Sequence, residues 1–249
     1  MTNILVTGGC GFIASNFLNI MKEKYPHYKF INLDYIDYCS NELNVKPGTA
    51  TLVKGDIRDK DLLTYLIKQY DFDIVFHFAA KSHVDNSFED PKDFTLNNAY
   101  GTHVILETFR ENKPNVEFIH FSTDEVYGES TTGIPKLIPK FKKLLKEGKK
   151  CTIHGTKSAQ IKRAFMHVED VVNAVDIVWK KGESGEIYNI ASDDEISVIE
   201  VTKLMIKTIT GSENYDKYIT FIEDRPFNDS RYYICSQKLK KLGWKQNKT

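Results

Sequence analysis

The feature that most constrains the fold is an alternation of short apolar strands and helices through the first 125 residues. Strands are expected at Asn3–Thr7, Lys29–Asp34, Ala50–Lys54, Asp73–Ala80 and Val116–Thr123. Amphipathic helices are expected between them, at Phe12–Lys24, Asp61–Gln69 and Asp93–Arg110. Strands that alternate with helices form parallel sheets covered on both faces. The pattern therefore predicts an α/β protein with a Rossmann-type, doubly wound parallel sheet.

The second half of the chain has shorter and less regular elements. Helices are expected at Leu137–Glu147, Val168–Val178 and Val198–Thr210, and strands at Cys151–His154 and Glu186–Ile190. This change of character predicts a dinucleotide-binding domain at 1–135 and a smaller C-terminal substrate lobe at 136–249. Some elements of the lobe are expected to return to the main sheet.

Composition and charge exclude several classes of protein. Lysine plus arginine equals aspartate plus glutamate, 34 each, which gives no electrostatic case for nucleic acid or an anionic membrane. The four cysteines are far apart and form no metal-binding pattern, and such sparse cysteines fit a reducing compartment. No apolar run approaches the roughly 20 residues of a membrane span. The chain is expected to be cytoplasmic, without a metal.

A glycine-rich turn at the end of the first strand indicates a dinucleotide site. In Gly8-Gly-Cys-Gly-Phe-Ile-Ala14 the glycines permit a tight turn, so that backbone N–H groups at the helix N-terminus can approach a pyrophosphate. Cofactor contacts are expected from Gly8, Gly11, Phe12 and Ile13. An acid about 20 residues further on binds the ribose 2′-OH in such sites. Asp34 stands there and would repel a 2′-phosphate, which favours NAD over NADP. The alternative is a plain loop-to-helix junction.

A second acidic position follows the third strand, in Gly55-Asp-Ile-Arg-Asp59. Asp56, with Ile57 beside it, is expected to meet the adenine edge of the cofactor. The alternative is a turn aspartate that caps the next helix.

The triplet Thr123-Asp124-Glu125 places a hydroxyl and two carboxylates at the end of the fifth strand. Two carboxyl groups with different tasks need environments that push their pKa values apart. A neutral Asp124 would donate a proton, and an ionised Glu125 would remove one. Successive strand residues point to opposite faces, so both reach one substrate only if the strand ends and bends here. The alternative is a turn with solvated acids.

With these motifs in view, the chain resembles the extended short-chain dehydrogenase/reductases. Within them it is similar to the nucleotide-sugar 4,6-dehydratases of the dTDP-glucose 4,6-dehydratase type. The matching segments run in family order along the chain. They are Thr7-Gly-Gly-Cys-Gly-Phe-Ile13, Gly55-Asp-Ile-Arg-Asp59, His77-Phe-Ala-Ala-Lys-Ser-His-Val-Asp85, Asn98-Ala-Tyr-Gly-Thr102, Ser122-Thr-Asp-Glu-Val-Tyr-Gly128, Lys136-Leu-Ile-Pro-Lys-Phe141, Tyr188-Asn-Ile190 and Asp224-Arg-Pro-Phe-Asn-Asp-Ser-Arg-Tyr232.

The resemblance implies a redox cycle without net oxidation. A hydride leaves C4 of the hexose for NAD, the C5 proton becomes acidic, water is lost across C5 and C6, and the hydride returns to C6. The product is a 4-keto-6-deoxy sugar on its nucleotide. By the family's pattern Glu125 is the C5 base, Asp124 the C6 acid, and Thr123 bonds the C4 oxygen.

The resemblance also implies a wider set of binding residues. Cofactor contacts fall on Ala79, Ala80, Asn98 and Ser122. Ser82 and His83 lie near the sugar, although His83 could equally be a packed loop histidine, and Leu137 and Ile138 flank the base. Arg163 and Arg225 bind the diphosphate through charge-assisted bonds. Asn228 stands where the family usually has histidine, which puts one phosphate contact in question.

One part of the family's pattern is missing. Its hydride step uses a Tyr-x-x-x-Lys pair on the helix after the Thr-Asp-Glu strand, where lysine lowers the pKa of tyrosine. Here Gly128 leads through 129–135 straight into Lys136, and the only such spacing, Tyr25-Pro-His-Tyr-Lys29, lies elsewhere. A helix and a strand are absent, which should open a sheet edge after Val116–Thr123.

Three explanations of the missing segment stay open. The natural molecule contains a segment that this sequence lacks, a genuine deletion makes an inactive form, or another part of the chain replaces it. The rival functions are a catalytically inactive NAD and nucleotide-sugar binder and a nucleotide-sugar epimerase. The nucleotide (dTDP or UDP) and the hexose also stay open. The family's habit predicts a homodimer.

Overall fold

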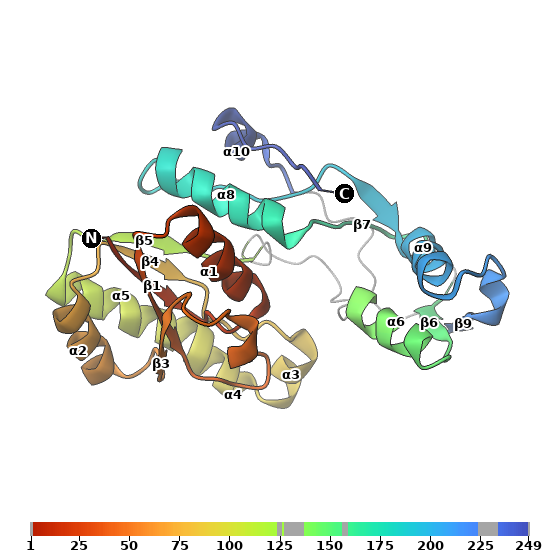
Figure 1. Cartoon of the computed structure of the whole chain (residues 1–249). Coiled ribbons are helices and arrows are strands. Elements are labelled where there is room, and N and C mark those ends of the chain that lie inside the picture. Colours follow the sequence, from red (N-terminus) through yellow and green to blue (C-terminus); the bar gives the residue numbers. More distant parts are fainter. Residues whose placement is uncertain (1, 124–125, 127–136, 156–158, 224–233, 249) are drawn as a thin grey trace. The chain divides into compact units, whose positions relative to one another are not determined.

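The computed structural model describes residues 2–123, 126, 137–155, 159–223 and 234–248. They form two compact units (Figure 1). The first comprises Met1–Thr123 and Val168–Lys181, and the second comprises Asp124–His167 and Gly182–Thr249. The predicted domain boundary at 135 lies outside the described residues.

A five-stranded parallel sheet forms the centre of the first unit. Its strands are β1 (Asn3–Thr7), β2 (Lys29–Asp34), β3 (Thr51–Lys54), β4 (Ile74–His77) and β5 (Glu117–His120). Their order is β3-β2-β1-β4-β5, and every pair is parallel. The predicted fold class is thereby confirmed. In the sheet, β2 and β3 lie on one side of β1, and β4 and β5 lie on the other. The direction of the strand order therefore reverses between β1 and β4, and ligands bind at this switch point in such folds.

Helices cover both faces of this sheet, as Figure 1 shows. The helices of the unit are α1 (Phe12–Lys24), α2 (Lys60–Tyr70), α3 (Val84–Glu89), α4 (Pro91–Phe94), α5 (Gly101–Asn112) and α8 (Val168–Lys181). A π-helical turn, η2 (Thr95–Tyr100), joins α4 to α5, so the helix predicted at Asp93–Arg110 is one run with a local change of winding. Such π turns often occur at functional sites.

Alternate strand residues build the two halves of the core. On one face, Leu5 and Val75 pack with Leu66 of α2 and Phe109 of α5, all buried. On the opposite face the ring of Phe76 lies 4.6 Å from Phe17 of α1 and 5.6 Å from Trp179 of α8, between ring centroids.

The helix α8, which comes late in the chain, is fixed to α1 by a buried carboxylate. Asp176 accepts hydrogen bonds from Lys24 Nζ (2.6 Å) and from the Tyr25 hydroxyl (2.9 Å). Its side chain is only 6% exposed, so removing either donor would leave a charge with less compensation. One helix of the later half thus returns to the first unit, whereas its described strands pair among themselves.

The strand β5 lies at the end of the sheet and pairs only with β4 among the described strands. Phe118 and Ile119 of β5 are half-buried, whereas all four residues of β4 are buried. This is the edge at which the sequence analysis places the missing strand.

A buried polar chain crosses the carboxyl ends of β1 and β4 at His77. The Ala79 N–H donates to Thr7 Oγ1 (3.3 Å), which lies 2.7 Å from His77 Nδ1, and His77 Nε2 lies 3.0 Å from Thr102 Oγ1. We assign the proton to Nε2, because the Thr7 hydroxyl already accepts from Ala79 and can donate to Nδ1. Burial, helped by His120, lowers the pKa of His77 to about 3.

This depressed pKa predicts acid sensitivity. The unfolded state binds the proton below about pH 6.5 and the folded state only near pH 3, so the unfolding free energy falls as pH falls through that window. Between pH 7 and pH 5 we expect His77 to cost about 2 kcal/mol. Urea titrations at both pH values would measure this loss, and His77→Gln, which keeps a donor and an acceptor, should reduce it. An equal loss of unfolding free energy in both proteins would contradict the lowered pKa of His77.

The second unit contains two small sheets and three helices among its described residues. The helices are α6 (Leu137–Lys146), α9 (Val198–Thr210) and α10 (Gln237–Lys241), and the 3-10 turn is η4 (Tyr215–Lys217). The strands β6 (Cys151–His154) and β9 (Ile219–Ile222) pair in parallel, and β7 (Lys162–Ala164) and β8 (Glu195–Ser197) pair antiparallel. Phe141, Ile153 and Ile206 form its core.

The strand predicted at Glu186–Ile190 is wrong, since this segment has no regular structure. A strand needs a neighbour that offers its backbone groups, and no described strand pairs with this segment. The prediction of a helix at Val198–Thr210 is confirmed. Its start is fixed by a capping box between Ser197 and Glu200.

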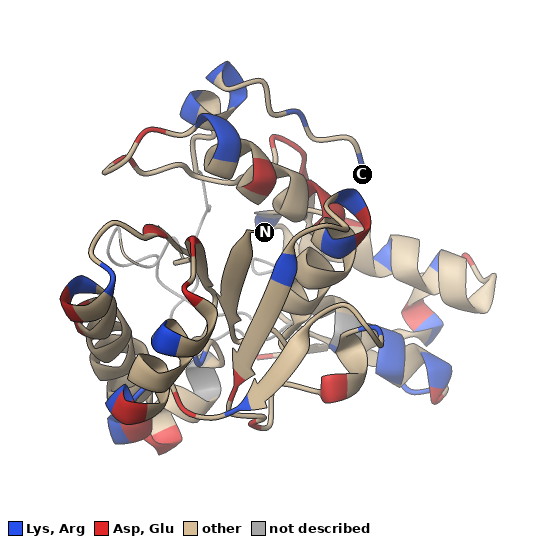
Figure 2. Ribbon diagram, turned by 60° about the vertical axis from the view of Figure 1, so that its left-hand side comes forward, with Lys and Arg blue, Asp and Glu red and all other residues tan. Residues whose placement is uncertain are grey.

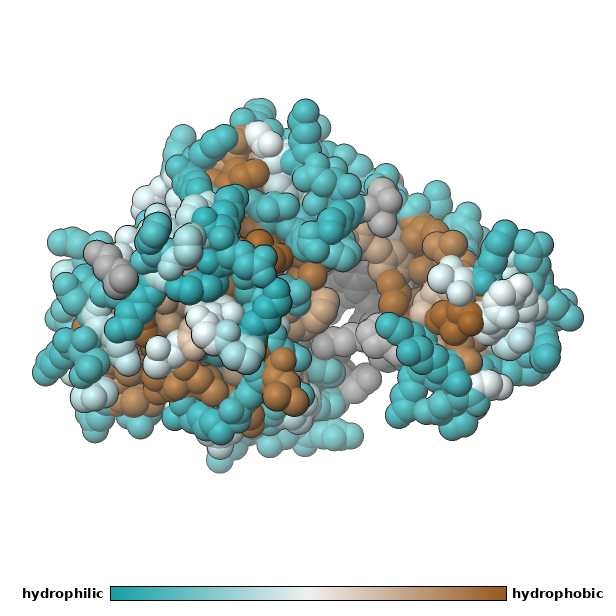
Figure 3. Space-filling view, viewed as in Figure 1, coloured by the Kyte–Doolittle hydropathy of each residue, from teal (hydrophilic) through white to brown (hydrophobic). Residues whose placement is uncertain are grey.

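Charged and apolar residues are dispersed over the surface. Figure 2 shows basic and acidic residues interspersed on the helices of the first unit. The side seen in Figure 3 is mostly hydrophilic, with small apolar patches. No helix in the described part of the chain is long and apolar enough to cross a membrane.

Candidate cofactor site at the carboxyl edge of the sheet

The glycine turn between β1 and α1 forms the floor of the candidate site. Gly8 has φ +71°, a left-handed conformation that suits glycine, and its N–H donates to Leu33 O (2.9 Å). A Cβ at Gly8 would lie 2.8 Å from the Cα of Ala79. The turn and the segment after β4 are therefore in backbone contact at the switch point.

The next residues of the turn are held by side chains from β2. The Gly9 N–H donates to Asn32 Oδ1 (3.0 Å), and Asn32 Nδ2 lies 3.3 Å from Cys10 Sγ. Burial and the nearby Asp34 carboxylate raise the pKa of the Cys10 thiol, which stays protonated at neutral pH. Asn32 was not among the predicted site residues. The sequence feature that could have indicated it is a polar residue inside an otherwise apolar strand.

The N-terminus of α1 is open to a ligand. Gly11 occupies the N-cap position without a side-chain cap, and the first bond of the helix runs from the Ser15 N–H to Gly11 O (3.0 Å). Within the described chain, no acceptor reaches the N–H groups of Phe12 and Ile13. Uncapped N–H groups at the positive end of a 13-residue helix suit a pyrophosphate. These residues thus fit the dinucleotide that the sequence predicts.

Asp34 lies at the end of β2 and is buried. Its Oδ2 accepts from the Cys10 N–H and its Oδ1 accepts from the Ile36 N–H, both at 2.8 Å. The carboxylate therefore ties the glycine turn to the segment after β2. Its contact with a ribose stays a prediction.

Asp56 and Arg58 form a pair after β3. Asp56 accepts from the Arg58 backbone N–H (2.8 Å) and from its Nε (2.8 Å to Oδ2). These bonds to Arg58 outweigh partial burial and lower the pKa of Asp56. The side chain of Ile57 is buried in the core against Gly101 of α5. Asp56 thus stands at the carboxyl edge, while Ile57 can offer a ligand only its backbone.

The segment after β4 carries four of the predicted residues. Ala79 is half-buried, Ala80 and Ser82 are exposed, and the ring of His83 lies 5.3 Å from that of Tyr38. Asn98 of η2 holds this segment from behind. Its Oδ1 accepts from the Lys81 N–H (2.8 Å), and its Nδ2 donates to Lys81 O (2.9 Å). Asn98 is thus a support for the segment, in addition to its predicted cofactor contact.

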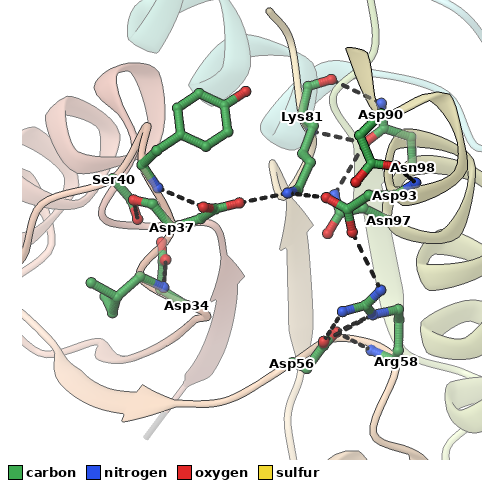
Figure 4. A network of polar contacts seen from close by, with 12 residues as sticks. Asp34, Asp37, Ser40, Asp56, Arg58, Lys81, Asp90, Asp93, Asn97 and Asn98 are labelled. Atoms are coloured by element: carbon green, nitrogen blue, oxygen red, sulfur yellow. Dashed lines mark hydrogen bonds and ion pairs between the residues drawn. The ribbon is translucent and has the colours of Figure 1, made fainter. Parts of the chain in front are cut away.

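Lys81 and Arg58 balance three carboxylates at this edge (Figure 4). Lys81 Nζ lies 2.7 Å from Asp37 Oδ2 and also pairs with Asp93. Arg58, already bonded to Asp56, reaches Asp93 at 3.8 Å. Partial burial opposes the charge on Lys81, but the two carboxylates raise its pKa. Lys81 was not among the predicted site residues, although it stands inside a matched motif.

The predicted acid–base triplet is only partly described. Ser122 and Thr123 follow β5 and are exposed. Asp124, Glu125, Arg225 and Asn228 lie outside the described residues, as does the side chain of Arg163. Leu137 and Ile138 begin α6 in the second unit. The structure therefore brings together residues of the first unit that are predicted to contact the cofactor, and both these contacts and the sugar contacts stay predictions.

Comparisons with known proteins agree with this geometry. The family model described as GDP-mannose 4,6 dehydratase matches residues 5–134 and 129–249. A dTDP-D-glucose 4,6-dehydratase of Mus musculus is 38% identical over 300 positions, covering 97% of this chain and 83% of that protein. The crystal structure of a dTDP-glucose 4,6-dehydratase from Bacillus anthracis with NAD is 30% identical, covers 100% of this chain and 93% of that one, and has a TM-score of 0.85.

The chain belongs to this family of nucleotide-sugar 4,6-dehydratases within the extended short-chain dehydrogenase/reductases, as its motifs predict. A trifunctional UDP-glucose 4,6-dehydratase/UDP-4-keto-6-deoxy-D-glucose 3,5-epimerase/UDP-4-keto-L-rhamnose-reductase of Arabidopsis thaliana is 38% identical over 98% of the chain, which spans only 44% of that protein. That alignment runs over 301 positions, whereas the chain has 249 residues, so more than 50 aligned positions have no counterpart here.

Proposed function

We propose that this protein is an NAD-dependent 4,6-dehydratase of a nucleotide-activated hexose, and that the 249 residues carry its cofactor and dehydration residues. The observation that carries the proposal is the joint presence of the open α1 N-terminus at the switch point and of Thr123-Asp124-Glu125 after β5. Membership of the family supports it. The solved relative from Bacillus anthracis holds NAD.

The chain carries cofactor-binding residues for the hydride half of the reaction and acid–base residues for the dehydration half. NAD, when bound, accepts and returns a hydride. The Gly8 turn and the α1 N-terminus would bind its pyrophosphate, and Asp34 its ribose. Thr123 would bond the C4 oxygen, Glu125 would take the C5 proton, and Asp124 would protonate the departing C6 hydroxyl. Loss of water requires both carboxyls, and an epimerase has no step that uses them.

The second candidate function is binding without turnover. Two observations favour it for the 249-residue chain. No Tyr-x-x-x-Lys follows β5, and the two matches to the family model meet at 129–134, where the sequence analysis places the missing helix and strand. The chain then keeps the sites for cofactor and sugar nucleotide but lacks the base for C4 oxidation.

Exchange at C5 tests the dehydration half of the proposed reaction without any hydride step. A nucleotide-linked 4-keto-6-deoxyhexose has an acidic C5 proton, and a dehydratase carrying Glu125 should exchange it for deuterium in D₂O. Mass spectrometry would follow the incorporation. We expect Glu125→Gln to slow exchange about 100-fold or more, and Glu111→Gln, on the exposed end of α5, to leave it unchanged. Exchange no faster than without protein would support the binder.

The cellular compartment and the oligomeric state are proposed on weaker features. None of the four cysteines, all within the described residues, forms a disulfide, and Cys10 and Cys151 are buried, as expected in a reducing compartment such as the cytoplasm. A homodimer is proposed on the family's habit alone, and sedimentation of the purified chain would test it.

A further inference from the structure

Two segments of the first unit lie on opposite sides of the end of β1. One follows β2 and the other follows β4, and β1 lies between these strands in the sheet. The segment after β2 is bonded to the glycine turn, and the segment after β4 is bonded to η2. The Asn41 N–H (3.0 Å) and Asn44 Nδ2 (2.9 Å) both donate to Cys10 O, and Asn98 binds the backbone of Lys81 at two atoms.

Side chains join the two segments across the end of β1. Lys81 Nζ pairs with Asp37 Oδ2 at 2.7 Å, and it lies 5.7 Å from the centre of the Tyr38 ring. The Tyr38 ring in turn meets His83 edge-on, with centroids 5.3 Å apart. Figure 4 shows Lys81 between Asp37 on one side and Asp93 on the other. These contacts form a bridge, which we call the strap and define as Asp37, Tyr38, Lys81 and His83.

The strap crosses the place where a dinucleotide would lie. Because β1 lies between β2 and β4, the strap spans the end of the strand that leads into the glycine turn. The segment after β2 that carries Asp37 and Tyr38 is bonded to Cys10 of that turn through Asn41 and Asn44. Lys81 is only 16% exposed and Asp37 27%, so their attraction is less screened than that of a surface pair. Lys81 also pairs with Asp93, so its ammonium should stay held beside this place when Asp37 is replaced.

We infer that Lys81 and Asp37 retain the bound dinucleotide by closing the strap over it. This inference rests on the proposed function. A reaction that removes a hydride and later returns it needs the cofactor to stay bound in between, so slow release is an advantage. The strap residues are positioning residues, since they act on the escape of the cofactor and not on the reacting atoms.

The test is the dissociation rate of NADH, followed by stopped-flow fluorescence after displacement with excess NAD. Lys81→Gln and Asp37→Asn should each raise this rate about three- to tenfold, with a smaller change in the association rate. The double variant should equal the singles, because both remove one contact. Lys81→Arg should retain slow release.

The matched control is Lys60→Gln, which breaks the exposed 2.7 Å pair between Lys60 at the start of α2 and Glu111 near the end of α5. It should leave both rates unchanged. Unchanged dissociation in Lys81→Gln and Asp37→Asn would overturn the strap alone. A wild-type chain that binds no NADH would overturn the strap together with the proposed function.

Discussion

Mixed with NAD and dTDP- or UDP-glucose, the 249-residue chain should bind the cofactor but form neither NADH nor a 4-keto sugar. Removal of the C4 hydride requires simultaneous removal of the hydroxyl proton, and the family assigns that task to a tyrosine that this chain lacks. A positioned base contributes about 10²–10⁴-fold to such a step. Calorimetry would measure binding of NAD, and absorbance with mass spectrometry would measure turnover.

Restoring the missing segment should restore the reaction. Residues 129–135 lie where the two matches to the family model meet. Replacing them by the corresponding segment of the mouse relative, including its Tyr-x-x-x-Lys, should raise product formation at least about 100-fold over the original chain. The matched control carries the same insert with its tyrosine changed to phenylalanine. It should bind NAD equally and stay inactive.

Turnover by the unmodified chain would refute this expectation and would mean that another residue replaces the tyrosine. The intact mass of the protein from its natural source is the companion measurement. A mass above that of 249 residues would show that the natural molecule carries the segment, and its activity would then need no insert.

The sequence predicts those parts of the fold that depend on short-range patterns. Gly8, the apolar run of β4 and the amphipathic helices each carry a local signal, and the parallel sheet follows from their order. The strand expected at Glu186–Ile190 had the right local pattern but no pairing partner among the described strands. Partner availability is a long-range property that no window of sequence contains.

The contacts between distant side chains could not be predicted from the sequence for the same reason. Asp37 and Lys81 are 44 positions apart, and nothing near either residue indicates that they meet. Asn98 was expected only at the cofactor, yet its amide supports the backbone of Lys81 from η2. Asp34 was expected only to contact the cofactor ribose, whereas in the structure its carboxylate also accepts hydrogen bonds from two backbone N–H groups. Sequence motifs identify the candidate residues, but only the three-dimensional contacts show which of these residues support other parts of the site.

Gly8→Ala should weaken cofactor binding at least tenfold and strongly destabilise the first unit. The new Cβ meets two obstacles at once. The left-handed backbone with φ +71° costs an L-residue roughly 1–2 kcal/mol. The methyl group would also lie 2.8 Å from the Cα and 2.9 Å from the N of Ala79, which are backbone atoms that cannot rotate away. Relief of this overlap requires the segment after β4 to move, at a further cost of about 1–3 kcal/mol.

Gly48→Ala separates the two costs. Gly48 has nearly the same conformation, with φ +78°, but no atom lies within 4 Å of its would-be Cβ. It should lose only the conformational part, roughly 1–2 kcal/mol in urea unfolding, and keep full affinity for NAD. Gly8→Ala should lose about 2–5 kcal/mol and at least tenfold in affinity, because movement of Ala79 also displaces the wall of the site. Equal losses in both variants would show that the contact between the glycine turn and Ala79 contributes nothing to stability, and unchanged NAD affinity in Gly8→Ala would place the cofactor elsewhere.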